Sequence, residues 1–396
     1  MFRILEVLGP EHEFALVDEA LQPVPVVDQV IKKLRGRIAN YADCQTFMFG
    51  KELQAHVAEL SAIKPFISPV SFEATMQNAI EYIQELLSTH FAVQLLGTGM
   101  HPLLFPHDVK IWTHRDRQIY SILHQLFNLY QHGWVNIHAF QLNLSYGSQP
   151  EALRLHYLIS QILPYIVAIT ASSPLCEGRF SGYVDTRLFY YQQSQVRIPS
   201  LLGHIVPETV SSFHDYRQKI ISRYSRDLAA HGAPKFMLHR EWLNSRGAIF
   251  RFDRHAIEIR IMDEQECIQA DVAISCFLRA CLRGLFTQQN LNTPRQHLIQ
   301  DLHAVMQQGL KARVLHQYGP TAKHVCRTLL HIATNHATRE EKKYLSSVRR
   351  RIEEGNLADI LRRDIEKKAQ KTTMREAILT IYTRLIQHLQ RNEMYF

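Results

Sequence analysis

The chain has 396 residues, of which 46% are hydrophobic and 21% are charged, and its formal net charge is +8. These proportions are those of an ordinary soluble globular protein with enough residues for a large core. The longest apolar run, residues 158–170, is broken by polar residues and a proline and is too short to span a bilayer. With no signal-peptide pattern at the N-terminus, we expect a cytoplasmic protein that does not insert into a membrane.

The excess positive charge is concentrated in the last part of the chain. From residue 311 to the end there are 18 Lys and Arg against 9 Asp and Glu. Acidic residues are interleaved with the basic ones there and aromatic stacking platforms are missing, which argues against nucleic acid as a partner. The six cysteines contain no C-x-x-C pair and are typical of reduced structural thiols in a cytosolic protein.

The first predicted elements are strands over residues 2–8 and 12–17, separated by a turn at Gly9 and Pro10. Glu11 and Glu13 lie two residues apart, so they project from the same face of a strand and repel each other unless a cation lies between them. Oxygen ligands on a rigid sheet suit a divalent metal that serves phosphate chemistry. The alternative is a solvent-facing strand edge that happens to carry two glutamates.

A second pair of glutamates, Glu52 and Glu59, follows. Alternation of apolar and polar residues over 57–62 predicts a strand for the second half of this segment, so the pair is weak evidence when taken alone. Further along, the sequence predicts a helix over 68–90 with proline at its first position, a strand over 91–96, a helix over 118–131 and a strand over 135–145.

A long helix is predicted from residue 150 to about 171, and a Gly/Ser-rich loop comes after it. The loop contains Ser172 and Ser173, then Arg179, Tyr183 and Arg187. A loop of this kind can fold over an anionic ligand, with an arginine pairing a carboxylate or phosphate bidentately. In isolation, a simple polar connection is the more common explanation.

A β-hairpin is predicted from residues 248–252 and 256–262. Strict alternation in its second strand places Glu258 and Arg260 on one face and three isoleucines on the other. Such a pair is usually a cross-face salt bridge. Beside a metal–phosphate site, however, the glutamate can ligate the cation while the arginine stabilises charge on transferring phosphoryl oxygens.

Beyond residue 271 the pattern is almost wholly helical, with helices expected over 271–287, 294–308, 321–335, 338–354, 357–368 and 373–392. Strands mixed with helices, without a regular βαβ cadence, favour an α+β fold with an antiparallel sheet. We therefore expect a catalytic domain over residues 1–290 and a basic helical C-terminal region over 291–396, packed on that domain or extending from it. The amphipathic helices of that region also suggest a homo-oligomer.

The order of these motifs resembles the glutamate–cysteine ligase family, specifically its bacterial carboxylate–amine ligase branch. The matching features are G-x-E-x-E-F, the glutamate pair seven apart, G-x-H-P at 99–102, A-S-S-P…E-G…G-Y…R and I-E-I-R-x-M-D, in series from about Glu6 to Arg283. The resemblance implies a glutamine-synthetase-like core, a curved antiparallel sheet with helices on its convex face. Its concave face would hold ATP, Mg²⁺ and an amino acid, and the γ-carboxylate of glutamate would be phosphorylated and then attacked by an amine.

The resemblance also assigns roles to individual positions. The metal ligands would be Glu11, Glu13, Glu52, Glu59 and Glu258. Arg260 would lie near the transferred phosphate, and Tyr183 and Arg187 near substrate or phosphate. Ser172 and Ser173, in the loop after the long helix, would contribute to nucleotide binding.

One position departs from the family pattern. The family usually has histidine on a strand at the place where this chain has Gln141, with His138 three residues earlier. The amide oxygen of glutamine is a weaker ligand for magnesium than imidazole or carboxylate. We favour Gln141 as the ligand, with a register slip that substitutes His138 as the alternative.

The sequence thus predicts an ATP- and Mg-dependent enzyme that joins small molecules, an amino acid and an amine whose identity it does not reveal. Two other functions remain open. One is a catalytically degenerate protein that binds a nucleotide or an amino acid and regulates a partner. The other is a phosphotransferase on the same fold. Retention of all five glutamates favours catalysis.

Overall fold

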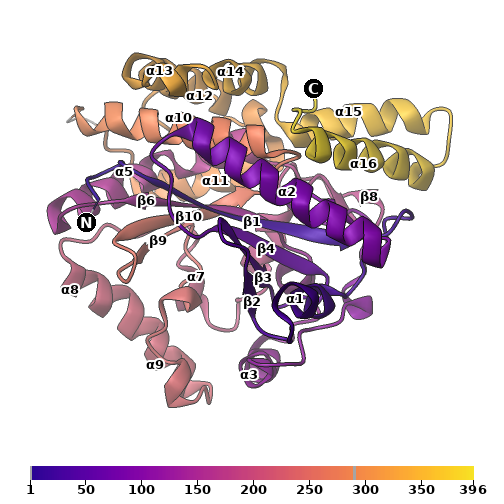
Figure 1. Cartoon of the computed structure of the whole chain (residues 1–396). Helices are drawn as coiled ribbons and strands as arrows, with labels where there is room; N and C mark the ends of the chain where they lie inside the picture. The colour runs from indigo at the N-terminus through magenta and orange to yellow at the C-terminus, as the bar shows by residue number, and fades with distance from the viewer. Residues whose placement is uncertain (1, 289–290) are drawn as a thin grey trace.

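A central antiparallel sheet organises the molecule, as the computed structural model shows for residues 2–288 and 291–396 (Figure 1). Within this part of the chain the strand order is β2-β3-β4-β1-β6-β10-β9, with β5 also paired to β1. The strands of this sheet are β1 Leu8–Val17, β2 Tyr41–Asp43, β3 Phe47–Lys51, β4 Val57–Ala62, β5 Gln94–Leu96, β6 Ala139–Ser145, β9 Ala248–Arg251 and β10 Ala256–Asp263. A small hairpin, β7 Leu175–Cys176 and β8 Arg179–Phe180, lies apart from the sheet. The α+β class and the antiparallel sheet predicted from the sequence are confirmed.

Helices are concentrated on one face of the sheet, above it in Figure 1, where α2, α5 and α10 pack on the strands. The other face carries shorter helices and long connections. The helices are α1 Val27–Arg35, α2 Pro69–Phe91, α3 Arg117–Phe127, α4 His132–Val135, α5 Gln149–Thr170, α6 Thr186–Gln193, α7 Pro199–Leu202, α8 Phe213–Tyr216, α9 Ser222–Ala230, α10 Ile268–Phe286, α11 Arg295–Gln308, α12 Ala322–His336, α13 Arg339–Lys342, α14 Leu345–Glu354, α15 Leu357–Ala369 and α16 Met374–Arg391.

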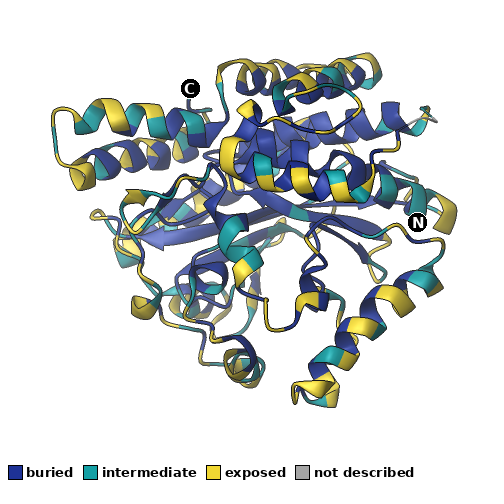
Figure 2. Ribbon diagram, turned by 180° about the vertical axis from the view of Figure 1, so that it is seen from behind, coloured by how far each residue is buried: buried dark blue, intermediate teal, exposed yellow. Residues whose placement is uncertain are grey.

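The two long helices predicted in the first half of the chain begin with the signals that the sequence contains. Ser68 caps α2 and Pro69 occupies its first turn, while Ser148 and Glu151 form a capping box at the start of α5. Helix α5 is long and apolar enough to cross a membrane, but 83% of its apolar window is buried inside the protein. It is therefore the central helix of the core, as the dark blue of the sheet and inner helices illustrates (Figure 2).

Strand β1 differs from its prediction because it runs without a break from Leu8 through Gly9 and Pro10. Proline cannot donate a ladder hydrogen bond, but β4 pairs with β1 only from Glu11 onward, so the strand continues past Pro10 without loss on that side. Residues 2–7, expected as a strand, are not one in the structure.

Several other boundaries also differ from the sequence prediction. Helix α2 extends to Phe91, so β5 starts only at Gln94. The strand expected from residue 135 begins at Ala139, because the short helix α4 precedes it. The single helix expected over 338–354 is split into α13 and α14.

The C-terminal helices complete the core rather than standing apart from it. One continuous cluster of buried side chains includes residues from β1, α5, α10, α12 and α14. Two fully buried carboxylates, Glu266 and Glu341, form ion pairs with Arg351 and Arg279 respectively. The domain boundary near residue 290 stays a prediction, while the packing of the helical region on the sheet-bearing part is evident in Figure 1.

Candidate active site

The face of the sheet opposite α2 and α10 opens into a cavity of about 490 Å³. Its floor consists of side chains from β1, β4, β6 and β10, and its walls come from α3, α6 and the segment before β9. Successive side chains of β1 point to opposite faces of the sheet. His12 therefore packs on Phe72 of α2, while Glu11 and Glu13 on either side of it face the cavity.

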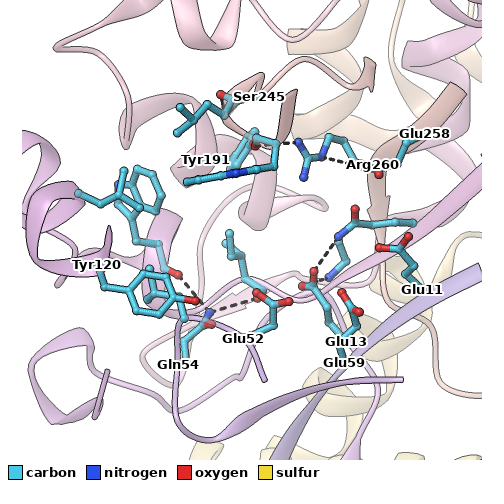
Figure 3. Close-up of a pocket in the computed structure, with 18 of the residues that line it drawn as sticks. Glu11, Glu13, Glu52, Gln54, Glu59, Tyr120, Tyr191, Ser245, Glu258 and Arg260 are labelled. Carbon is cyan, nitrogen blue, oxygen red and sulfur yellow. Dashed lines mark hydrogen bonds and ion pairs between the residues drawn. The ribbon is translucent and has the colours of Figure 1, made fainter. Parts of the chain in front are cut away.

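Carboxylates from distant parts of the chain converge on the floor of this cavity (Figure 3). Glu13 of β1 lies directly opposite Glu59 of β4, and Glu11 lies opposite Gln141 of β6. Glu258 of β10 lies opposite Asn143, whose amide donates to Glu11 at 3.0 Å. Pairing of four neighbouring strands therefore gathers acidic side chains that are up to 247 positions apart in the sequence.

The crowding of these carboxylates is unfavourable without a cation. Burial, together with the charge of Glu52, raises the pKa of Glu13 to about 8, although hydrogen bonds from Ala139 N and the Gln141 amide oppose the shift. Burial and three neighbouring glutamates raise the pKa of Glu59 well above its usual value, and the pKa of Glu52 is also raised by burial. A divalent cation would relieve this repulsion, and a set of oxygen ligands is what magnesium prefers.

Arginines surround the same carboxylates. Glu258 is fully buried and forms ion pairs with Arg251 and with Arg260, the latter at 3.3 Å. Glu11 forms an ion pair with Arg254, which lies on the turn of the β9–β10 hairpin. Arg260 is also fixed by the backbone carbonyl of Asn244 at 2.8 Å. The site thus presents both metal-type ligands and groups that can bind phosphate.

Behind the sheet, a buried network supports the strand that carries Glu13. The pairing of β1 with β6 ends at His12. The N–H of the next residue, Glu13, donates instead to the carboxylate of Glu264, at 3.1 Å. Glu264 and Asp271 each lie 3.3 Å from Nδ1 of His12. Burial disfavours the charged imidazole, but the two carboxylates outweigh it and raise the pKa of His12 to about 9.

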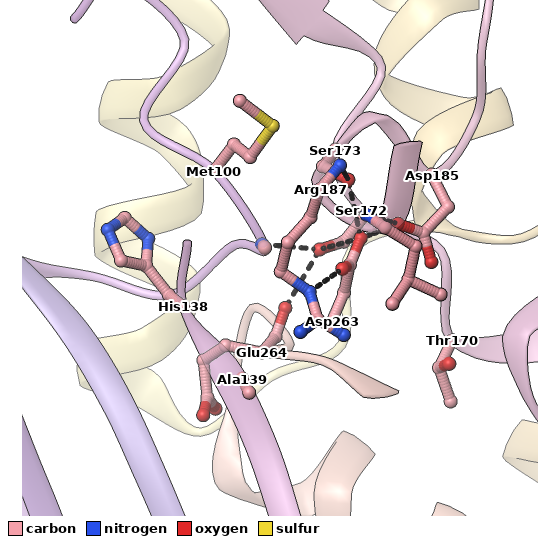
Figure 4. Close-up of polar contacts among 12 residues, drawn as sticks. Met100, His138, Ala139, Thr170, Ser172, Ser173, Asp185, Arg187, Asp263 and Glu264 are labelled. Carbon is pink, nitrogen blue, oxygen red and sulfur yellow. Dashed lines mark hydrogen bonds and ion pairs between the residues drawn. The ribbon is translucent and has the colours of Figure 1, made fainter. Parts of the chain in front are cut away.

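Arg187 enters the cavity from α6 and is held by a buried framework (Figure 4). Its Nε donates to Asp263 Oδ1 at 2.5 Å, and the other oxygen of Asp263 accepts from Ser172 N at 2.8 Å and Ser173 Oγ at 2.7 Å. Gly99 fits beside this carboxylate only because it has no side chain, since an added Cβ would lie 2.2 Å from Asp263 Cγ. The framework fixes the guanidinium of Arg187 relative to the sheet.

Most of the site residues predicted from the sequence line the cavity. They are Glu11, Glu13, Glu52, Glu59, Gln141, Arg187, Glu258 and Arg260.

Three predicted residues lie elsewhere. Ser172 and Ser173 are buried and bind Asp263, so the structure uses them to build the framework rather than to contact a nucleotide. Tyr183 stacks on Phe189 with ring centroids 4.3 Å apart and is not among the cavity-lining residues. The tyrosine that does line the cavity is Tyr191, one helical turn after Arg187 and on the same face of α6.

The choice between Gln141 and His138 is decided by position. Gln141 faces the cavity and donates its amide N–H to Glu13 Oε1 at 2.8 Å. His138 is fully buried, with Nδ1 3.0 Å from the carbonyl oxygen of Thr98, and Figure 4 shows it on the framework side. The register slip therefore does not occur, and a metal-ligand role for Gln141 stays a prediction.

Sequence reasoning missed several side chains that line the cavity. They are basic or aromatic, namely Lys51, Tyr120, Phe127, Trp134, Trp242, Arg251 and Arg254. Tyr120 on α3 contacts the ammonium of Lys51, which also lies 3.6 Å from Asp116. The β9–β10 hairpin was the available signal, because Arg251 at the end of β9 and Arg254 in the turn lie beside the strand that carries Glu258.

Comparison with known proteins agrees with this geometry. Residues 7–384 match the sequence profile of glutamate–cysteine ligase family 2, which spans nearly the whole chain. The chain belongs to glutamate–cysteine ligase family 2. The resemblance found in the motifs is thereby confirmed.

Two relatives differ in how much they share with this member of the family. A protein of Archaeoglobus fulgidus described as uncharacterized is 42% identical over 388 residues, which is 98% of this chain and 100% of its own length. A putative glutamate–cysteine ligase 2 of Nitrosospira multiformis is 23% identical over 207 residues, 50% of this chain and 48% of its own.

Solved structures share the fold at low sequence identity. Glutamate–cysteine ligase from Francisella tularensis, solved in complex with AMP, has a TM-score of 0.64 and 12% identity and covers 98% of this chain and 89% of its own. A bifunctional glutathione synthetase from Pasteurella multocida has a TM-score of 0.59 and 14% identity over 97% of this chain and 52% of its own. The family and these folds are those of carboxylate–amine ligases.

Proposed function

We propose that the protein is an ATP- and Mg-dependent ligase that joins the γ-carboxylate of glutamate, or of a similar amino acid, to an amine. The observation that supports this most strongly is the convergence of Glu11, Glu13, Glu52, Glu59 and Glu258 in one cavity with Arg187 and Arg260. Glutamate–cysteine ligation is one candidate, and we expect an enzyme of this kind to act in the cytoplasm.

The proposed reaction has two steps. The γ-carboxylate attacks the terminal phosphorus of ATP and gives an acyl phosphate and ADP; the amine then attacks the acyl carbon, loses a proton and releases phosphate. Activation is needed because the carboxylate alone is a poor acyl donor at neutral pH. Arg260 and Arg187 are fixed by backbone carbonyls and by Asp263, so they can stabilise charge on phosphoryl oxygens without reorganising.

The five glutamates, with the amide oxygen of Gln141, would hold the magnesium. Magnesium bound there would neutralise the crowded phosphate oxygens during transfer. The raised pKa of Glu13, Glu52 and Glu59 fits this role, because repulsion among these carboxylates is relieved by a divalent ion.

The proposal is tested by incubating the protein with ATP, Mg²⁺, glutamate and a panel of amines that includes cysteine. A ligase forms ADP together with an amide in equal amounts, detected by coupled ADP assay and mass spectrometry. ADP with a phosphorylated amino acid and no amide would identify a phosphotransferase. Nucleotide or amino-acid binding without turnover for any amine would favour the regulatory alternative and contradict the ligase.

Metal should stabilise the protein more at alkaline than at acidic pH. Between the ordinary carboxyl value of 4.5 and about 8, folded Glu13 keeps a proton that the unfolded chain has released, so without metal its contribution to stability falls as pH rises through this window. Mg²⁺ at 100 times its Kd adds about 2.7 kcal/mol to the free energy of unfolding.

This prediction is checked by melting curves at pH 5.5 and pH 8.5, with 10 mM Mg²⁺ or with EDTA. We expect the rise in Tm caused by Mg²⁺ to be several degrees at pH 8.5 and smaller at pH 5.5. Glu13→Gln should reduce the pH dependence of the melting temperature measured in EDTA. Equal Mg²⁺ effects at the two pH values would contradict the role of these carboxylates as metal ligands.

A further inference from the structure

Two arginines of the β9–β10 hairpin occupy oxygens that the proposed function assigns to magnesium. Nη1 of Arg254 forms an ion pair with Oε1 of Glu11, and Nη1 of Arg251 forms one with Oε2 of Glu258. Glu11 Oε1 also accepts the Asn143 amide at 3.0 Å. A carboxylate oxygen held in this way cannot at the same time coordinate a divalent cation, because the guanidinium and the ion would meet at the same atom and repel each other.

These two arginines differ from the other two cavity arginines in how they are fixed. Arg260 donates to the carbonyl of Asn244 at 2.8 Å, and Arg187 donates to the carbonyl of Ile261 at 2.5 Å. Backbone acceptors of this kind stay in place whatever binds in the cavity.

The guanidinium groups of Arg251 and Arg254 are held by carboxylate side chains instead of backbone carbonyls. Across residues 2–288 and 291–396, the ion pairs found for Arg251 are with Glu258, Glu241 and Asp253, and that of Arg254 is with Glu11. The side chain of Arg254 is 45% exposed, and its turn is open to solvent. The exposed side chain of Arg254 can therefore swing when Glu11 is taken by another cation. The side chain of Arg251 is only 17% exposed, but Glu241 and Asp253 offer it other partners when Glu258 is taken.

We propose that Arg254 and Arg251 are exchangeable counter-ions that hold Glu11 and Glu258 until a divalent cation binds and then turn to the phosphate oxygens of the nucleotide. The proposal rests on the proposed function, because it needs both metal and nucleotide to bind in this cavity. The exchange keeps the charge of the cavity balanced, since each incoming cation releases an arginine and the nucleotide supplies the anion that the released arginine meets.

The exchange predicts effects of opposite sign on two ligands. Removing the charge of Arg254 takes away a competitor for Glu11, so a metal alone should bind more tightly. The same change removes a phosphate partner, so the nucleotide should bind more weakly. A purely structural salt bridge would give no such split, because its loss would weaken both ligands or neither.

The experiment measures binding to the full-length protein by titration calorimetry, with Mn²⁺ alone and then with ADP at saturating Mn²⁺. The variants are Arg254→Gln, Arg251→Gln and Arg254→Lys, and Arg217→Gln, an arginine on the far side of the hairpin stacked on Phe252, is the matched control. For Arg254→Gln we expect the Kd of Mn²⁺ to fall about fivefold and the Kd of ADP to rise about tenfold. Arg254→Lys should remain close to the wild type for Mn²⁺.

The outcomes separate the two levels of the argument. If the wild type binds Mn²⁺ and ADP but Arg254→Gln and Arg251→Gln bind Mn²⁺ no more tightly, the exchange is overturned and the proposed function stands. If the wild type binds neither ligand, both are overturned. Melting curves of each variant show that the affinities are measured on folded protein. In Arg254→Lys the positive charge is kept, so its Kd for Mn²⁺ tests the role of the charge in a conservative variant.

Discussion

Replacing Glu258 by glutamine is expected to abolish ADP formation while the protein stays folded. Glu258 is fully buried on the inner strand β10, between Arg251 and Arg260. Glutamine keeps the shape of the side chain and an oxygen that can accept from the arginines, but it removes the charge that would hold a divalent cation. Even changes in groups that only orient a metal ligand cost about 10- to 100-fold, so loss of the ligand charge itself should exceed about 100-fold.

The matched control is Glu241→Gln. Glu241 also faces Arg251, at 3.9 Å, but it does not line the cavity. We expect this control to keep most of the wild-type rate in a coupled ADP assay. If Glu258→Gln kept more than about a tenth of the wild-type rate, the assignment of Glu258 to the metal would have to be abandoned.

Local alternation in the sequence was enough to predict the strand-borne part of the site. Glu11 and Glu13 lie on a regular stretch of β1, where a period of two fixes the face on which each side chain lies. Glu258 lies on the regular part of β10, and Arg260 lies where the register of β10 against β6 shifts, but both side chains still line the cavity. Once the strands were identified, the shared face of each pair followed, and the order of the motifs indicated that the pairs belong to one family.

The sequence pattern did not determine the parts of the site where a tertiary contact decides the outcome. Ser172 and Ser173 lie in a loop whose composition is typical of anion binding, but buried Asp263, 91 and 90 positions away in the sequence, accepts their hydrogen bonds. Glu52 lies in the connection between β3 and β4, so its place in the cavity depends on the turn rather than on a periodicity. Tyr120 and Trp134 line the cavity because of where α3 and α4 lie in the fold, which the local sequence pattern does not indicate.

The C-terminal helices show the same limit. Their existence followed from amphipathic periodicity, but their charges did not indicate where they pack. The buried pair between Glu266 and Arg351 joins the segment after β10 to α14, and the backbone N–H of Tyr395 donates to the same glutamate at 2.9 Å. A basic helix that looks solvated in the sequence therefore contributes one arginine, Arg351, to the interior.

Replacing Asp263 by alanine is expected to lower the free energy of unfolding by about 3–5 kcal/mol, because it leaves the charge of Arg187 buried without its partner. Arg187 is nearly inaccessible and Asp263 is fully buried. The loss also removes the acceptor of the hydrogen bonds from Ser172 N and Ser173 Oγ. The measurement is equilibrium unfolding in urea, fitted for the midpoint and the slope.

The control for this stability prediction is Glu353→Ala, which breaks ion pairs of Glu353 with Arg327 and Lys323 on the surface. Exposed pairs of this kind contribute about 0–1 kcal/mol, because water and salt screen them. The contrast isolates burial as the cause, since both substitutions remove one carboxylate that binds an arginine. Asp263→Ala with a loss no larger than that of the control would mean that Arg187 finds another partner, and the framework would then not fix its position in the cavity.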